Sequence, residues 1–172
     1  LRPSPRIERG LFRRRALLLP DGYWDMEKAE GGIGAVLLLP EEQPKVYGLM
    51  IPGSLGQQLL TAEPGPGQEP KSQRNTQAEI LAILTAVLTW STELRGMDVL
   101  VVTDSSATQG NILSGSSSDA HSQELVAFLW YVLTAFDIQV WVQWLPSKQN
   151  PGDPFSRPLT HQDEAFSIAA HI

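Results

Sequence analysis

The sequence contains no cysteine, which excludes disulfide bonds and thiolate metal sites. It also lacks an apolar run near the roughly 20 residues of a membrane-spanning helix, and no signal peptide is evident. We therefore expect no membrane association. The 172 residues suit one domain with a proper core. Because the first residue is Leu1 and not Met, we expect the sequence to be part of a longer chain.

Positive charge is scarce beyond the N-terminal 15 residues. These hold six Arg and one Glu, a net +5, and since the whole chain carries −6, residues 16–172 carry −11. So acidic a domain should bind phosphate backbones poorly unless cations intervene. Two interpretations stay open: a soluble acidic domain behind a basic linker, or an acidic site that needs metal before it accepts nucleic acid. We interpret residues 1–15 as a basic tether and 16–172 as the folded domain.

The first part of the domain is predicted to be a three-stranded antiparallel meander. Apolar runs separated by short Gly- and Pro-containing turns predict strands at 16–24, 33–39 and 45–51. Residues 52–74 are rich in Gly, Pro and Gln, so we expect a long, mobile loop there.

The second part alternates helices and strands. A broad apolar stripe predicts a well-covered helix from a cap at Asn75 or Thr76 to about Gly96. A buried parallel strand at 98–103, helices at 105–113 and 119–136, an alternating strand at 138–145 and a last short helix capped by Thr160 and Asp163 follow. The five tryptophans are interpreted as packing residues rather than base-stacking platforms.

Four acidic residues differ in context from ordinary surface carboxylates. Asp21 ends an apolar strand, Glu79 begins an apolar helix, Asp104 follows the buried strand and Asp153 lies after the last strand. Strand ends can bring such groups together, and converged carboxylates need cations, with Mg²⁺ or Mn²⁺ favoured by hard oxygen ligands. Asp25 is an alternative to Asp21. Glu79 and Asp104 could instead serve only helix N-termini.

Four motifs occur in an order that resembles the ribonuclease H family. Over roughly residues 16–157 they are Asp21-Gly22 with Gly31-Gly32-Ile33-Gly34-Ala35, Asn75 four residues before Glu79, Thr103-Asp104-Ser105, and the ending WLPSKQNPGDPFSR. The ending is similar to ribonuclease H domains of retroelement polymerases.

The resemblance implies an α/β fold with a five-stranded mixed sheet, three antiparallel strands then parallel ones, flanked by helices. It implies an endonuclease that hydrolyses the RNA strand of RNA–DNA hybrids with two metal ions, Mg²⁺ or Mn²⁺. Asp21 would bridge the ions, Asp153 would complete the site that activates water, and Glu79 and Asp104 would hold the ion beside the leaving 3′ oxygen.

By the same resemblance the partners are an RNA–DNA hybrid and a preceding polymerase domain, in an intracellular protein, cytoplasmic or nuclear. RNA preference would arise from contacts to 2′-hydroxyl groups. Two of the candidate substrate-binding residues have a simpler alternative role: Asn75 could only cap its helix, and Gln77 could only be solvated. The candidate substrate-binding residues are Gly31, Gly32, Asn75, Gln77, Ser105 and Lys148, the last standing nearest the place of the family's loop histidine.

Some features depart from the family. Glu79 follows Asp21 by 58 residues, and Asp153 follows Asp104 by 49, too few for the basic extra helix of some cellular members. Two other classes remain: a DDE-type integrase or transposase, whose late acidic residue would be Glu124, and a non-catalytic connector or scaffold that keeps the fold.

Overall fold

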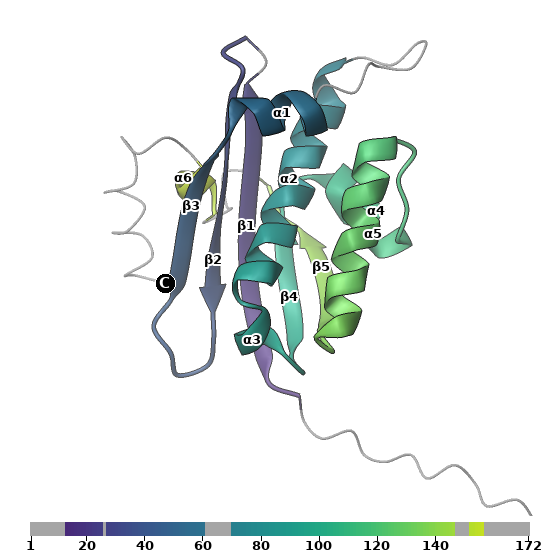
Figure 1. The fold of residues 1–172 in the computed structure, drawn as a ribbon. Helices are drawn as coiled ribbons and strands as arrows, with labels where there is room; N and C mark the ends of the chain where they lie inside the picture. Colours follow the sequence, from purple (N-terminus) through teal and green to yellow (C-terminus); the bar gives the residue numbers. More distant parts are fainter. Residues whose placement is uncertain (1–12, 26, 61–69, 147–151, 157–172) are drawn as a thin grey trace, which may run out of the picture.

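The computed structural model describes residues 13–25, 27–60, 70–146 and 152–156. One five-stranded sheet, in the order β3-β2-β1-β4-β5, forms its centre (Figure 1). Three strands are antiparallel, and the two pairs that involve β4 are parallel. The mixed sheet predicted from the sequence is therefore confirmed.

The strands lie close to where the apolar runs place them. Their bounds are β1 Arg15–Asp25, β2 Glu30–Leu38, β3 Lys45–Ile51, β4 Asp98–Thr103 and β5 Gln139–Trp144. β1 is the central strand, flanked by β2 on one side and β4 on the other. β1 therefore pairs with strands from both halves of the chain.

Helices cover the two faces of the sheet unequally. Their bounds are α1 Gly53–Leu60, α2 Pro70–Thr89, α3 Ser91–Leu94, α4 Ser106–Ser114, α5 Ala120–Ala135 and α6 Asp153–Ser156. α2 and α5 pack over one face, and the short α6 lies on the other (Figure 1). None of the helices in the described part of the chain combines the length and apolarity needed to cross a bilayer.

The main core lies between the sheet and α2 with α5. Leu18 of β1 and Val101 of β4 meet Ile80 and Val87 of α2 and Leu129 of α5 there, all essentially inaccessible to solvent. This burial of whole aliphatic side chains, about 1.5–3 kcal/mol each, is the main force that holds α2 across β1. α2 in turn carries Glu79 toward the sheet.

The predicted long loop at 52–74 is wrong at both of its ends. α1 forms at Gly53–Leu60, where Gly56 lets the helix approach the ring of Trp24 so closely that a Cβ would overlap it. α2 begins at Pro70, a residue that suits the first helical position because its missing N–H has no helical partner there. The Gly- and Pro-rich composition did not predict either helix, because both depend on packing in the tertiary structure. Residues 61–69 lie outside the described part.

The start of α2 corrects a second expectation. Asn75 and Thr76 do not cap the helix, because it begins five residues earlier. Asn75 instead accepts a hydrogen bond at Oδ1 from the backbone N–H of Trp24, at 3.2 Å. The predicted helices at 105–113 and 119–136 agree within a residue or two with α4 and α5, which Ser105 and Asp119 cap.

The tryptophans divide into two groups. Trp24 and Trp90 are buried as packing residues, as predicted. Trp130, Trp141 and Trp144 are exposed, although Trp130 donates a hydrogen bond to the carbonyl of Ile112. These three side chains lie on α5 and on the edge strand β5, and the apolar pattern alone did not show that they are exposed.

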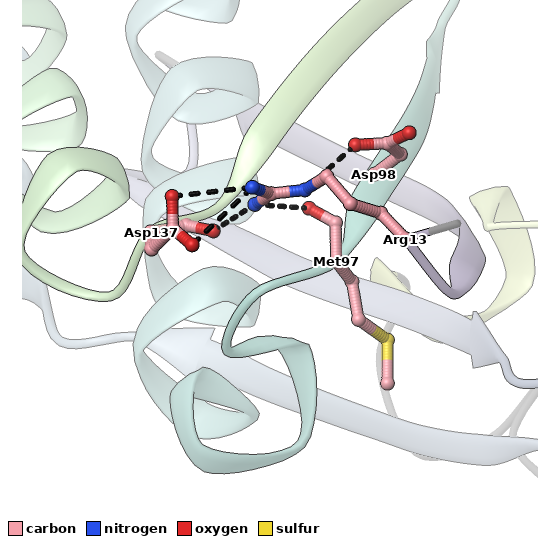
Figure 2. Close-up of polar contacts among 4 residues, drawn as sticks. All are labelled: Arg13, Met97, Asp98 and Asp137. Atoms are coloured by element: carbon pink, nitrogen blue, oxygen red, sulfur yellow. Dashed lines mark hydrogen bonds and ion pairs between the residues drawn. The ribbon is translucent and has the colours of Figure 1, made fainter. Parts of the chain in front are cut away.

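The predicted tether ends earlier than residue 15. β1 begins at Arg15, and Arg13 is part of the fold (Figure 2). Its guanidinium pairs with Asp98 at 3.0 Å and with Asp137 at 3.2 Å, and it donates to the carbonyls of Met97 and Asp137. The cluster ties the start of β1 to the turn between α5 and β5. Residues 1–12, and the predicted helix at Thr160 and Asp163, lie outside the described residues.

Arg13→Ala should reduce the free energy of unfolding by about 1 kcal/mol, the upper range for partly exposed ion pairs, because it removes two carboxylate partners together. Arg14→Ala is the matched control, since Arg14 makes a longer, more exposed pair with Glu42 at 3.6 Å. It should cost less than about 0.5 kcal/mol. Urea unfolding of both variants measures the difference. Equal losses would show that Arg13 does not anchor the strand.

Candidate metal centre

Asp21 lies in the middle of β1, opposite Gly34 of β2, and only 4% of it is exposed. Asp25, the alternative from the sequence, ends the strand and serves the following turn. The backbone N–H groups of Lys28 and Glu27 donate to its carboxylate, at 3.2 and 2.9 Å. These bonds, that of Lys28 foremost, lower the pKa of Asp25. The structure therefore favours Asp21 as the inward carboxylate.

Glu79 reaches Asp21 from α2. It lies midway along this helix, not in the first turn as predicted, so a helix N-terminus does not explain it. Gly22 of β1 makes the approach possible, because a Cβ there would overlap the carbonyl of Ala78. The carboxylate of Glu79, 5% exposed, accepts a hydrogen bond at 3.2 Å from the hydroxyl of Thr103.

Asp104 completes the group from the end of β4. One carboxylate oxygen each of Asp21, Glu79 and Asp104 lies within 4.8 Å of the others, and no other cluster of this kind occurs in the described parts of the chain. Glu124, the late acidic residue that a DDE-type site would use, is exposed on α5 and outside this group. The three carboxylates form the candidate metal centre.

The electrostatics of the centre favour a proton or a cation. Burial, then the charges of Asp21 and Asp104, raise the pKa of Glu79 to about 10, which the bond from Thr103 only partly offsets. Without a cation Glu79 is therefore protonated at neutral pH. Three hard oxygen donors this close are the ligand type that Mg²⁺ and Mn²⁺ prefer, so the residues fit a divalent metal ion.

Asp153, the fourth predicted carboxylate, starts α6 and is half-buried. It does not belong to the group within 4.8 Å. Ser156 links it to the centre, since its hydroxyl donates a short hydrogen bond to Asp21 and lies 3.0 Å from the carbonyl of Asp153. The structure thus places Asp153 in the segment beside the centre, and its metal role stays a prediction.

The glycines of β2 make room for α6. A Cβ at Gly32 would overlap the carbonyl of Ser156, and one at Gly34 would overlap the backbone of Phe155. Phe155 packs with Leu19 on this face of the sheet. The glycine-rich hairpin therefore lets α6 lie directly on the strand, and this close approach brings Ser156 to Asp21.

Two functional candidates escaped the sequence reasoning as individual residues. Thr103 and Ser156 are both fully buried and hydrogen bond to the carboxylates of Glu79 and Asp21. Each lies inside a motif that resembles the ribonuclease H family, TDS for Thr103 and the final Ser-Arg for Ser156. The motifs contain both residues, but their hydrogen bonds could not be predicted, because the acceptors of buried hydroxyls are known only from the tertiary structure.

The predicted substrate-binding residues are dispersed. Gly31 and Gly32 are buried near the start of β2, against Trp24 and α6 respectively, and this close packing gives another reason for both glycines. Asn75 is exposed and Ser105 is half-buried beside Asp104. Their contacts to substrate stay predictions, and Lys148 lies outside the described residues.

Gln77 is buried, so the expectation that it could only be solvated is wrong. Its side chain is 1% exposed, and its Nε2 donates to the carboxylate of Asp119 at 2.7 Å. Burial alone would raise the pKa of Asp119, but bonds from Ser122 and Gln77 outweigh it and lower this pKa. A direct contact between Gln77 and substrate would require this buried bond to break, because α5 covers the residue. Gln77 is therefore a link between α2 and α5.

Comparisons with known proteins identify the fold. Comparison of the sequence with protein-family models and with curated proteins gives no match. Solved structures do match: ribonuclease H1 of the halophilic archaeon Halobacterium salinarum has a TM-score of 0.59 at 18% identity, with 90% of this chain and 98% of that chain covered.

LC11-RNase H1, isolated from compost by a metagenomic approach, has a TM-score of 0.63 at 17% identity, covering 91% of this chain and 98% of its own. Its structure in complex with an RNA/DNA hybrid has a TM-score of 0.57 at 16% identity, covering 82% and 93%. The chain therefore has the ribonuclease H-like fold. At these identities the likeness establishes the fold alone.

Gly34→Ala should destabilise the protein by about 1–3 kcal/mol, because the added methyl group must displace α6. It should also weaken the rise in melting temperature that Mn²⁺ causes, since Ser156 moves away from Asp21. Gly110→Ala in α4 is the control, because a Cβ there meets nothing within 4 Å. This change should raise the free energy of unfolding by at most about 1 kcal/mol, since Ala favours a helix over Gly. Calorimetry with and without Mn²⁺ measures both. The same metal response in both variants would contradict the role of α6.

The raised pKa of Glu79 predicts how stability depends on pH without metal. The folded state holds this proton up to about pH 10 and the unfolded state only to about 4.5, so the free energy of unfolding should fall as pH rises between these values. The slope from this group is at most about 1.4 kcal/mol per pH unit.

Glu79→Gln should remove that slope and stabilise the protein at neutral and alkaline pH. Glu124→Gln, an exposed change of the same chemistry, should leave the slope unaltered. Urea unfolding in chelator at a series of pH values distinguishes the two. A slope unchanged in Glu79→Gln would mean that Glu79 is already ionised in the fold.

Proposed function

We propose that this chain is a ribonuclease H, an endonuclease that hydrolyses the RNA strand of RNA–DNA hybrids at a two-metal centre. The observation that carries the proposal is the convergence of Asp21, Glu79 and Asp104 within 4.8 Å, on the fold of ribonucleases H. One structural neighbour was solved in complex with an RNA/DNA hybrid, which supports the same substrate class here.

The proposed ligands are Asp21, Glu79 and Asp104, with Asp153 as the fourth through the position of α6. Bound Mg²⁺ or Mn²⁺ would lower the pKa of the attacking water and neutralise charge on the phosphorane. The protein contributes orientation: Thr103 holds Glu79 and Ser156 holds Asp21.

Discrimination of RNA needs hydrogen bonds to 2′-hydroxyl groups. The side chain of Asn75 suits this task, because its Oδ1 is taken by the N–H of Trp24 and its amide nitrogen is left to donate from an exposed position. Ser105 accepts from the N–H of Thr108, so its hydroxyl proton is available beside Asp104. Both roles agree with the expectation from the sequence.

A polar pocket of about 160 Å³ lies next to this region, between α2, α4 and the loop before α5. Thr76, Asn111, Ser117 and Ser118 line it and offer hydroxyl and amide donors. The carboxylate of Asp119 also lines the pocket, and it accepts hydrogen bonds from Gln77 and Ser122. Such hydroxyl and amide donors can bind phosphate oxygens without a cationic side chain. We therefore include the pocket in the proposed path of the nucleic-acid backbone.

The proposed context is the ribonuclease H domain of a retroelement reverse transcriptase, with a polymerase domain as its partner in the same polyprotein. The ending from Trp144 to Arg157 supports this context through its resemblance to such domains. The buried acidic group counts against a non-catalytic scaffold, because three clustered carboxylates with no cation to hold destabilise a fold.

Cleavage of a labelled RNA–DNA hybrid tests the proposal. Mg²⁺ or Mn²⁺ should support cutting of the RNA strand, and Ca²⁺ should not, since its larger and more flexible coordination shell misplaces the reactants. Asp104→Asn should lower the rate about a thousandfold or more, because a lost metal ligand removes several kcal/mol of transition-state stabilisation.

Asp25→Asn, in the same strand as Asp21 but outside the group, is the control and should retain the parent rate within about twofold, as expected for a surface substitution. Undiminished cutting by Asp104→Asn would eliminate the proposed centre. Equal loss in both variants would point to a damaged fold in place of a lost ligand.

A further inference from the structure

Trp144 contacts the segment that carries Asp104. It is the last residue of the edge strand β5 and pairs with Thr103 at the end of β4. The final backbone bond between these strands runs from the N–H of Leu145 to the carbonyl of Thr103, at 2.9 Å. Beyond it the indole Nε1–H of Trp144 donates to the carbonyl of Asp104, at 2.8 Å. The side chain thus extends the strand pairing by one bond after the backbone has turned away.

The neighbouring bonds show why this one matters. The N–H of Ser105 donates to the hydroxyl of Thr103 at 3.2 Å, and Ser105 caps α4 by accepting from Thr108 at 3.1 Å. The peptide between Asp104 and Ser105 is therefore held from the β5 side by Trp144 and from the α4 side by the cap. Fixing this peptide sets the direction in which the carboxylate of Asp104 leaves the backbone.

We infer that Trp144 is a positioning residue that keeps the carboxylate of Asp104 in the group with Asp21 and Glu79. The inference rests on the proposed function of that group. Core packing does not account for Trp144, because 42% of it is exposed on an edge strand. Leu145 and Trp144 together anchor the end of β4, and Thr103 in this segment holds Glu79, so the end of β5 orders two of the three carboxylates.

The chain offers a control three residues earlier. Trp141 lies on the same strand and is 67% exposed, and no hydrogen bond from its indole occurs within the described residues. Trp144→Phe and Trp141→Phe therefore make the same chemical change, loss of an indole N–H with an aromatic ring retained. Only the first removes a bond to the segment of Asp104.

The test is a calorimetric titration of each protein with Mn²⁺ alone, followed by hybrid cleavage. Trp144→Phe should bind Mn²⁺ about tenfold more weakly, the lower range for loss of a group that orients a metal ligand. Its kcat should fall while its KM for the hybrid stays unchanged, and its melting temperature in chelator should equal that of Trp141→Phe. Trp141→Phe should match the parent in Mn²⁺ affinity and in kcat.

The outcomes separate this inference from the proposed function. A parent protein that binds no Mn²⁺ refutes the metal centre itself. A parent that binds Mn²⁺ together with two variants of equal affinity overturns only the role of Trp144. Hydrogen exchange by NMR on the unaltered protein gives a second measurement if Trp144→Phe fails to fold. The indole proton of Trp144 should exchange much more slowly than that of Trp141, and equal rates would overturn the inference.

Discussion

Three carboxylates held within 4.8 Å of one another, two of them buried, repel strongly unless a proton or a cation intervenes. The surrounding fold is what keeps them there. The core between β1 and α2 holds Glu79 against Asp21, and hydroxyl groups of Thr103 and Ser156 satisfy the carboxylates. Packing energy from the apolar core thus stabilises an arrangement that its own electrostatics oppose, as is common for functional sites.

Glycine is the means by which separate segments reach this centre. Gly22 admits α2 to β1, and Gly32 and Gly34 admit α6 to β2, each at a distance that a Cβ would prevent. Residues that a sequence pattern would assign to turns or to substrate therefore serve the assembly of the site. The opposite end of the sheet is organised differently, by the ion pairs of Arg13. β4 spans about 20 Å between these ion pairs and the candidate metal centre, so Arg13 does not reach the centre.

The metal-free and metal-bound states should differ mainly in charge. The raised pKa of Glu79 means that the group carries a proton until a cation replaces it, which couples metal binding to proton release. An edge strand with an exposed tryptophan, at Trp144, and a four-residue helix, α6, hold the flanks of the group. Such peripheral elements open more readily than the core. The positions of the carboxylates therefore depend on the least buried elements that contact them.

Hydrophobic periodicity by itself predicted the strands of the sheet and the two capped helices α4 and α5, because apolar spacing is a local property. The acidic residues were predicted from their places in the chain together with the resemblance of four motifs to the ribonuclease H family. Periodicity did not predict α1, which forms in a Gly-rich segment because it packs against Trp24. It also did not predict that α2 starts at Pro70, although proline favours the first position of a helix. Only the tertiary structure distinguished Asp21 from Asp25 and showed that Gln77 is buried. It also showed the hydrogen bonds by which Thr103, Ser156 and Trp144 contact the acidic residues of the centre. Hydrogen bonds between residues more than 20 positions apart leave no periodic trace in a sequence, and they exist only once packing has brought their donors and acceptors together.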